Sequence, residues 1–213
     1  MAVKGILFDL DGTLIDSRRD IANCVNFTLA ELGHAPLSVE RVERMVGDGV
    51  RQLLSRAIGP MDEPTQKRAL EIFLPYYRDH CTDTTRLYPG VIETLRFFAG
   101  MGLALVTNKP MVHTEKTLAT LGLNTYFPVV LGGDSLARRK PDPEPLWEAL
   151  RRLDVFPGDA VMVGDSPMDI QAARSAGVRV VAVSYGFRTE EELQSLSPDF
   201  LISDFTQLRE VLK

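Results

Sequence analysis

Cysteine and histidine are both scarce in this sequence. Among 213 residues there are two cysteines, Cys24 and Cys81, and three histidines, and neither type shows the close paired spacing of a zinc site. Cys24 falls on a helical apolar stripe with Ile21, Val25 and Leu29, so we expect it to pack in a core. A reduced, cytoplasmic protein fits these counts.

Long apolar runs and an excess of positive charge are also missing. No stretch approaches the ~20 apolar residues of a membrane span, and the first apolar run stops at Asp9, too early for a signal peptide. The net charge of −5 argues against a protein that binds nucleic acid or a membrane surface, because both need basic patches. An anionic substrate would therefore have to be met by a few placed cations and a metal.

Short apolar runs that end in polar residues recur along the chain. They are rich in Val, Ile and Leu and do not alternate, which is typical of parallel strands buried on both faces. The runs are Gly5–Leu10, Leu103–Val106, Val129–Leu131, Ala160–Val163, Val178–Val183 and Phe200–Ile202. Helical patterns lie at 91–100, 112–121, 143–153, 167–176, 189–196 and 205–212. This alternation predicts an α/β fold with a doubly wound parallel sheet, a Rossmann-like core.

Residues 17–81 break this alternation. They contain about four helical stretches and no convincing strand, and Ser17 followed by Asp20 resembles a capping box at a helix start. We predict that 17–81 form an all-helical cap domain inserted after the first strand. The α/β core would then consist of residues 1–16 and 82–213.

Polar residues follow four of the predicted strands, and in open parallel sheets ligands bind at this edge. They are Asp9 and Asp11, Thr107 and Asn108, Lys140, and Asp165 with Asp169 one turn into the next helix. Such a set suits phosphoryl transfer. A carboxylate attacking a phosphate meets a repulsion of about 4 kcal/mol per charge pair at a separation near 4 Å and an effective dielectric of about 20. Fixed cations must offset it, and magnesium held by carboxylates supplies one while a lysine supplies another.

These motifs make the sequence similar to a known family. In order along the chain, Asp9-Leu10-Asp11-Gly12-Thr13, Thr107, Lys140 and Gly164-Asp165 with Asp169 resemble the four motifs of the haloacid dehalogenase-like hydrolases. Within that family the chain looks like the phosphoglycolate phosphatase-like members with a helical cap. The resemblance covers essentially the whole chain.

The resemblance implies roles for the core residues. Asp9 would be the nucleophile that forms an aspartyl-phosphate, and Asp11 the general acid and base. Thr107 would bind the transferring phosphoryl group with Asn108 beside it, and Lys140 would neutralise charge between Asp9 and the phosphate. The implied substrate is a small phosphorylated metabolite.

The resemblance also implies a Mg²⁺ cofactor. Asp165 would bind it alongside Asp9 and the backbone carbonyl of Asp11, with Asp169 supporting the site from behind. The site offers oxygen ligands without His or Cys, as a hard cation prefers.

Asp11 indicates which reaction of the family to expect. Dehalogenases of the family carry an aromatic residue there, whereas phosphatases and phosphomutases carry a second aspartate, because the leaving alkoxide needs a proton and the later water must lose one. A phosphatase is the first interpretation, and a sugar phosphomutase like β-phosphoglucomutase stays open. A phosphoacceptor signalling domain is a distant alternative, since its acceptor aspartate follows a middle strand and it lacks a helical insertion.

The helical segment offers candidate substrate contacts. Gly47 and Gly49 flank Asp48, and the glycines would let the backbone approach the substrate. Arg51 follows on the next helix and could pair with a substrate anion, although a solvated arginine is the alternative. Relatives often carry Asn where Asp48 stands, and an acidic residue there would repel an anionic substrate. The sequence is compatible with a monomer or a homodimer.

Overall fold

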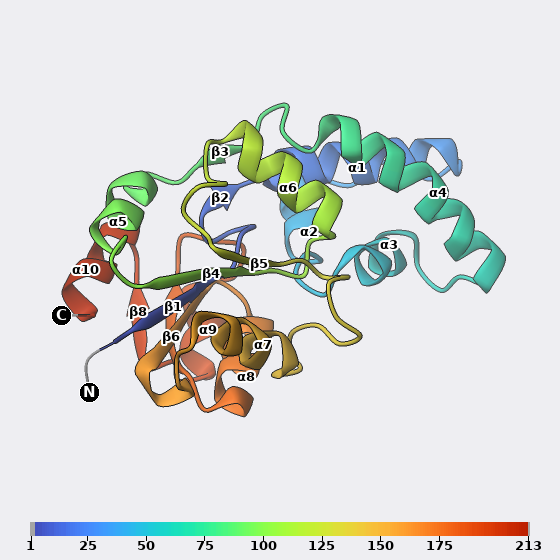
Figure 1. Ribbon diagram of the computed structural model, residues 1–213. Coiled ribbons are helices and arrows are strands. Elements are labelled where there is room, and N and C mark those ends of the chain that lie inside the picture. Colours follow the sequence, from blue (N-terminus) through green and yellow to red (C-terminus); the bar gives the residue numbers. More distant parts are fainter. Residues whose placement is uncertain (1–2, 213) are drawn as a thin grey trace.

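A six-stranded parallel sheet is the centre of the fold (Figure 1). The computed structural model describes residues 3–212. The strand order is β5-β4-β1-β6-β7-β8. The strands are β1 Gly5–Phe8, β4 Gly102–Val106, β5 Val129–Leu131, β6 Ala160–Gly164, β7 Arg179–Val183 and β8 Phe200–Ile202. Each overlaps an apolar run of the sequence, and the predicted fold class is confirmed.

Strand β1 lies where the strand order reverses. It pairs with β4 on one side and with β6 on the other, so that Ile6 is opposite both Leu103 and Val161. The chain runs outward from β1 through β4 to β5 and then crosses back to β6. The carboxyl ends of β4 and β6 therefore diverge on either side of β1, which opens a crevice at this edge of the sheet.

Helices cover both faces of the sheet. One face packs against α5 (Val91–Phe97), α6 (Met111–Thr120) and α10 (Leu208–Val211), and the other against α7 (Glu144–Leu153), α8 (Pro167–Ala176) and α9 (Glu190–Ser195). Short 3₁₀ turns, η1 (Pro157–Asp159) and η2 (Phe205–Gln207), complete this part. The strands read as unbroken apolar runs because both of their faces are buried.

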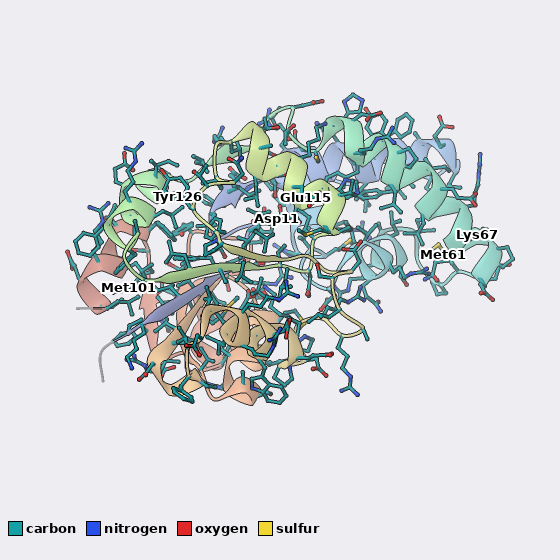
Figure 2. All side chains as sticks on the ribbon, viewed as in Figure 1. Asp11, Met61, Lys67, Met101, Glu115 and Tyr126 are labelled. Carbon is teal, nitrogen blue, oxygen red and sulfur yellow. The ribbon has the colours of Figure 1, made fainter. Side chains whose placement is uncertain are left out.

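Four helices lie between β1 and the rest of the sheet in sequence. They are α1 Arg18–Glu31, α2 Val39–Glu43, α3 Val50–Ile58 and α4 Glu63–His80. They share an apolar cluster of their own, which includes Val25, Leu54 and Phe73. In Figure 2, Asp11 lies between the sheet and this helical segment, while Met61 and Lys67 lie at the segment's far end.

A two-stranded antiparallel ribbon joins the helical segment to the sheet. It consists of β2 (Ile15–Asp16), where the chain enters the helical segment, and β3 (Arg86–Leu87), where the chain returns to the sheet. The sequence did not predict it, because two-residue strands leave no readable alternation. Below the ribbon, the buried Asp20 carboxylate accepts hydrogen bonds from the backbone and hydroxyl groups of Thr84 and Thr85.

The capping box expected at Ser17 and Asp20 is wrong. Ser17 is the N-cap of α1, but its side chain makes no capping hydrogen bond. Its hydroxyl donates to Asp11 Oδ1 at 2.6 Å instead. The side chains of Ser17 and Asp20 both form hydrogen bonds that join α1 to the rest of the fold. These tertiary hydrogen bonds replace the local ones of a capping box. Among residues 3–212, no helix is both long and apolar enough to span a membrane.

Candidate active site

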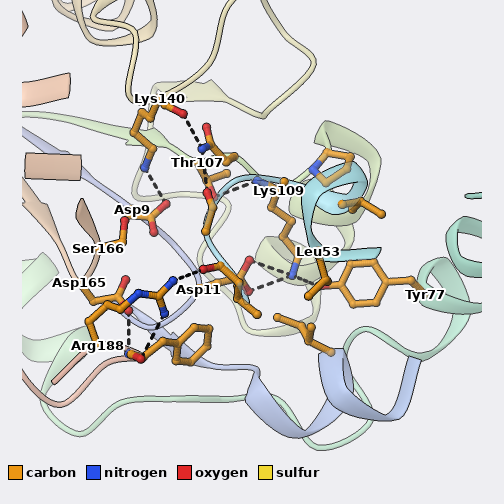
Figure 3. Close-up of a pocket in the computed structure, with 18 of the residues that line it drawn as sticks. Asp9, Asp11, Leu53, Tyr77, Thr107, Lys109, Lys140, Asp165, Ser166 and Arg188 are labelled. Carbon is orange, nitrogen blue, oxygen red and sulfur yellow. Dashed lines mark hydrogen bonds and ion pairs between the residues drawn. The ribbon is translucent and has the colours of Figure 1, made fainter. Parts of the chain in front are cut away.

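Asp9, Lys140 and Asp169 form a buried ionic group at the carboxyl end of the sheet (Figure 3). Lys140 Nζ donates to Asp9 Oδ1 at 2.8 Å, to Asp169 Oδ1 at 2.6 Å and to the Val106 carbonyl at 2.6 Å. Burial by itself would lower the pKa of Lys140, but the carboxylates of Asp169 and Asp9 outweigh it and raise the pKa. The predicted cation therefore lies directly beside the predicted nucleophile.

Asp9 is held so that one carboxylate oxygen stays available. Its backbone N–H donates to the Val163 carbonyl at 2.9 Å, which extends the β1–β6 pairing by one residue. Oδ1 accepts from Lys140, whereas Oδ2 accepts no hydrogen bond from the described part of the chain. Burial raises the pKa of Asp9 to about 6, although Lys140 lowers it. Oδ2 is therefore the Asp9 oxygen without a partner among residues 3–212.

Asp169 supports Lys140 and also starts helix α8. Its Oδ2 accepts from Ser166 N at 3.1 Å and from Ser166 Oγ at 2.6 Å, and its Oδ1 accepts from Lys140. The residue is fully buried and does not line the pocket. A Cβ on Gly164 would come within 2.3 Å of Asp169 Cγ, so glycine is required at the end of β6. Asp169 is thus placed to orient Lys140.

Asp165 enters the site from the end of β6. Its Oδ2 accepts from the Phe187 backbone N–H at 2.7 Å, and its Oδ1 from Thr13 Oγ1 at 3.3 Å. A Cβ on Gly12 would lie 2.2 Å from Asp165 Oδ2, and one on Gly186 would lie 2.3 Å from its Cβ. Glycines on two loops therefore let the backbone close around this carboxylate.

The acidic group fits a hard divalent cation. Carboxylate oxygens of Asp9, Asp165 and Asp169 lie within 4.8 Å of one another. Burial raises the pKa of Asp165 well above its usual range, and the nearby Asp9 and Asp169 carboxylates raise it further. The single positive charge of Lys140 does not neutralise these three carboxylates. Asp169 binds Lys140 and Ser166 behind the pocket, whereas Asp9 and Asp165 line it and are the side chains placed to hold the ion.

Asp11 faces a second buried lysine. Lys109 Nζ lies 3.0 Å from Asp11 Oδ1 and 3.3 Å from Oδ2, and its side chain is 1% exposed. Lys109 also donates to the Tyr77 hydroxyl, and its ammonium lies 4.8 Å from the centre of the Tyr77 ring. Tyr77 belongs to α4. The carboxylate of Asp11 is therefore oriented by Lys109 and Ser17, and Lys109 connects it to the helical segment.

Thr107 and Asn108 follow β4 into the same pocket. Thr107 N donates to the Leu131 carbonyl at 2.9 Å, and Thr107 Oγ1 accepts from Lys109 N at 3.3 Å. The Asn108 amide donates to the carbonyls of Gly47 and Lys140, each at 2.8 Å. One Asn108 donor therefore joins the helical segment to the end of β4, and the other holds the loop that carries Lys140.

The pocket itself lies between the sheet edge and the helical segment. It encloses about 60 Å³, and its lining combines Asp9, Asp11, Asp165, Thr107, Lys109, Lys140 and Arg188 with apolar side chains of the helices such as Val50, Leu53 and Phe73. A space of this size holds a few water molecules or one small molecule. Gly47 and Gly49 also line it.

The structure does not bring Arg51 to this pocket. Its side chain is exposed and donates to Gln66 of α4 at 3.2 Å. Asp48 also points elsewhere, because its carboxylate pairs with Arg56 and lines a different depression. The proposed substrate contact by Arg51 therefore has no support here, and Asp48 is not an obstacle to an anion. Helical periodicity predicts which residues share one face of a helix, but it does not predict which part of the protein that face contacts.

Sequence reasoning missed Lys109, Tyr77 and Arg188. Lys109 stands next to Asn108, and Arg188 follows β7, so the strand-end rule that found the other residues could have found both. Tyr77 continues the buried stripe of α4 with Phe73 and left no separate signal. Ser166, directly after Asp165, is a further residue of the site that the sequence did not single out.

A doubly wound sheet with carboxylates and a lysine at its strand ends, below an inserted helical segment, is the arrangement of one hydrolase family. A model of the haloacid dehalogenase-like hydrolase family matches residues 6–183. This chain belongs to that family.

Two relatives and one solved structure match it over nearly their full length. The chain is 38% identical to a phosphoglycolate phosphatase of Colwellia psychrerythraea, with 98% of this chain and 96% of the relative covered. It is 37% identical to a phosphoglycolate phosphatase of Chromobacterium violaceum, with 99% and 97% covered. The crystal structure of a predicted phosphoglycolate phosphatase from Haemophilus somnus superimposes with a TM-score of 0.93 at 34% identity, covering 99% and 98%.

Proposed function

We propose that this protein is a magnesium-dependent phosphatase that hydrolyses small phosphate monoesters, 2-phosphoglycolate first among them, through an aspartyl-phosphate at Asp9. The observation that carries the proposal is the unpaired Asp9 Oδ2 at the pocket, with Lys140 on the other oxygen and Asp165 beside it. The relatives named phosphoglycolate phosphatase support the choice of substrate.

The first step forms the phosphoenzyme. Asp9 Oδ2 attacks phosphorus, a new O–P bond forms and the ester O–P bond breaks. Lys140 and the hydroxyl of Thr107 balance charge on the phosphoryl oxygens. Asp11 must leave its ion pair with Lys109 and enter this step protonated, and it then gives that proton to the departing alkoxide.

The second step returns the enzyme. Asp11, now deprotonated, takes a proton from water as that water attacks phosphorus. The bond between phosphorus and Asp9 breaks, inorganic phosphate leaves and the Asp9 carboxylate is restored. Mg²⁺, held by Asp9, Asp165 and the backbone carbonyl of Asp11, would supply positive charge to the phosphoryl oxygens.

Residues 17–81 would act as a cap over this chemistry, with 1–16 and 82–213 as the catalytic core. The pocket lies between these two parts of the chain. Closure of the cap would limit the access of water until the phosphoenzyme has formed.

A screen of phosphorylated metabolites with Mg²⁺ tests the function. We expect phosphate release from small esters, fastest from 2-phosphoglycolate. Glucose 1-phosphate with a trace of the bisphosphate should give phosphate and little glucose 6-phosphate. Dominant isomerisation would replace the phosphatase by a mutase, and no release from any ester would refute it.

A further inference from the structure

Arg188 enters the pocket from the loop after β7 and touches the helical segment. Its guanidinium donates to the backbone carbonyls of Glu43 at 3.3 Å and Phe187 at 3.2 Å, and also to that of Val46. Val46 lies 142 residues away in the chain. Figure 3 shows Arg188 pointing into the same pocket as Asp9 and Asp165.

Three cations line this pocket, and only one of them lacks a carboxylate partner among residues 3–212. Lys140 pairs with Asp9 and Asp169, and Lys109 pairs with Asp11. Arg188 contacts carbonyl oxygens alone. The side chain of Glu43 pairs with Arg18 at 3.3 Å.

The guanidinium therefore has capacity for an anion. Its three hydrogen bonds do not use all of its N–H groups, and the remaining ones have no acceptor in the described part of the chain. The neutral carbonyls leave the positive charge of this partly enclosed guanidinium without a counter-ion. A carboxylate suits it best, because a planar guanidinium binds a carboxylate with two parallel hydrogen bonds.

We propose that Arg188 binds the carboxylate of a phosphorylated small acid and so determines the substrate class of this site. The inference rests on the proposed phosphatase function. The phosphoryl end of such a substrate lies at Asp9, Lys140 and Thr107, which leaves Arg188 for the other end. Because Arg188 also holds the carbonyls of Glu43 and Val46, the carboxylate is bound where the helical segment meets the sheet. Arg188 then both selects the substrate and holds the helical segment in position.

A pair of substrates that differ only in the carboxylate tests this. Ethyl phosphate carries a methyl group where 2-phosphoglycolate carries the carboxylate. In Arg188→Gln, kcat/KM for 2-phosphoglycolate should fall about 10- to 150-fold more than kcat/KM for ethyl phosphate, as for loss of a charged hydrogen bond. Arg188→Lys keeps the charge without the fork and should lose part of that ratio. It also provides the measurement if the glutamine variant does not fold.

Arg41→Gln is the matched control, because Arg41 is an exposed arginine on α2 outside the pocket. Its substrate ratio should equal that of the wild type. Equal losses on both substrates in the Arg188 variants would overturn the inference and leave Arg188 as a bridge to the helical segment. No loss on either substrate would also overturn it. A wild-type enzyme that hydrolyses neither ester would instead refute the phosphatase function.

Discussion

Lys140 Nζ lies 2.6 Å from Oδ1 of Asp169, a fully buried carboxylate whose other oxygen binds Ser166 at the start of α8. The orientation of Lys140 thus depends on Asp169 in the first turn of α8, the helix that connects β6 to β7. Breaking a buried ion pair by removing one partner is costly, because the other charge stays buried.

Asp169→Asn should lower kcat/KM by about 10- to 100-fold, the range found for residues that orient groups at a metal site. The asparagine keeps the shape but removes the charge that balances Lys140. Asp142→Asn is the control, since Asp142 is close in sequence to Lys140 but pairs with the exposed Arg138. Steady-state kinetics decide, and equal activity in both variants would remove Asp169 from the site.

Asp9→Asn should reduce phosphate release by at least about a thousandfold, because an amide is not a nucleophile at this position. Acid-quenched wild type should carry substrate-derived phosphate on Asp9, and the variant should carry none. Thermal unfolding should show that the variant is folded. Turnover above a few per cent of wild type would exclude covalent catalysis at Asp9.

Chelation should abolish activity, and Mg²⁺ should restore it. Asp165→Asn should raise the Mg²⁺ concentration needed for half-maximal rate, because one of the two carboxylates that line the pocket beside the proposed ion is lost. Mg²⁺ should also raise the melting temperature of the wild type more than that of this variant, since an ion that binds the folded state stabilises it. Full activity in chelator would contradict the metal requirement.

His113 should make the fold sensitive to acid. It lies on α6 against Tyr77 of α4, and neither ring nitrogen has a hydrogen-bond partner among the described residues. Burial lowers its pKa from 6.5 to about 4. The unfolded chain therefore binds more protons than the fold between these values. The contribution of neutral His113 to the free energy of unfolding is fully present above pH 6.5 and declines as the pH drops through this window. Below pH 4 up to roughly 3 kcal/mol has been lost.

His113→Leu should lack this contribution, because leucine cannot be protonated. The free energy of unfolding, measured in urea from pH 7 to pH 4, should decline less steeply for the variant than for the wild type. His34→Gln changes an exposed histidine and should follow the wild-type curve. Identical slopes for His113→Leu and wild type would mean that the ring is protonated in the fold without cost.

Arg51→Ala should leave the ratio of kcat/KM for 2-phosphoglycolate and ethyl phosphate unchanged. Its exposed side chain contacts Gln66 and does not line the pocket. Kinetics with both esters check this. A selective loss on 2-phosphoglycolate would mean that α3 turns this arginine toward the substrate during turnover.

The sheet and the set of residues at its edge could be predicted from the amino-acid sequence alone. Six apolar runs predicted six strands, because strands buried on both faces leave unbroken runs. Asp9, Thr107, Lys140 and Asp165 could be grouped from strand positions alone, since parallel strands end at one edge.

The way in which the helical segment meets that edge depends on contacts between residues far apart in the chain. Arg188 and Val46 are far apart in the chain, and no local pattern predicts their contact. Arg51 and Tyr77 lie on helices whose periodicity gives a buried face but not its neighbour. Which arginine faces the pocket depends on the packing of α1 to α4 against the loops after β4 and β7, and this is set by long-range contacts.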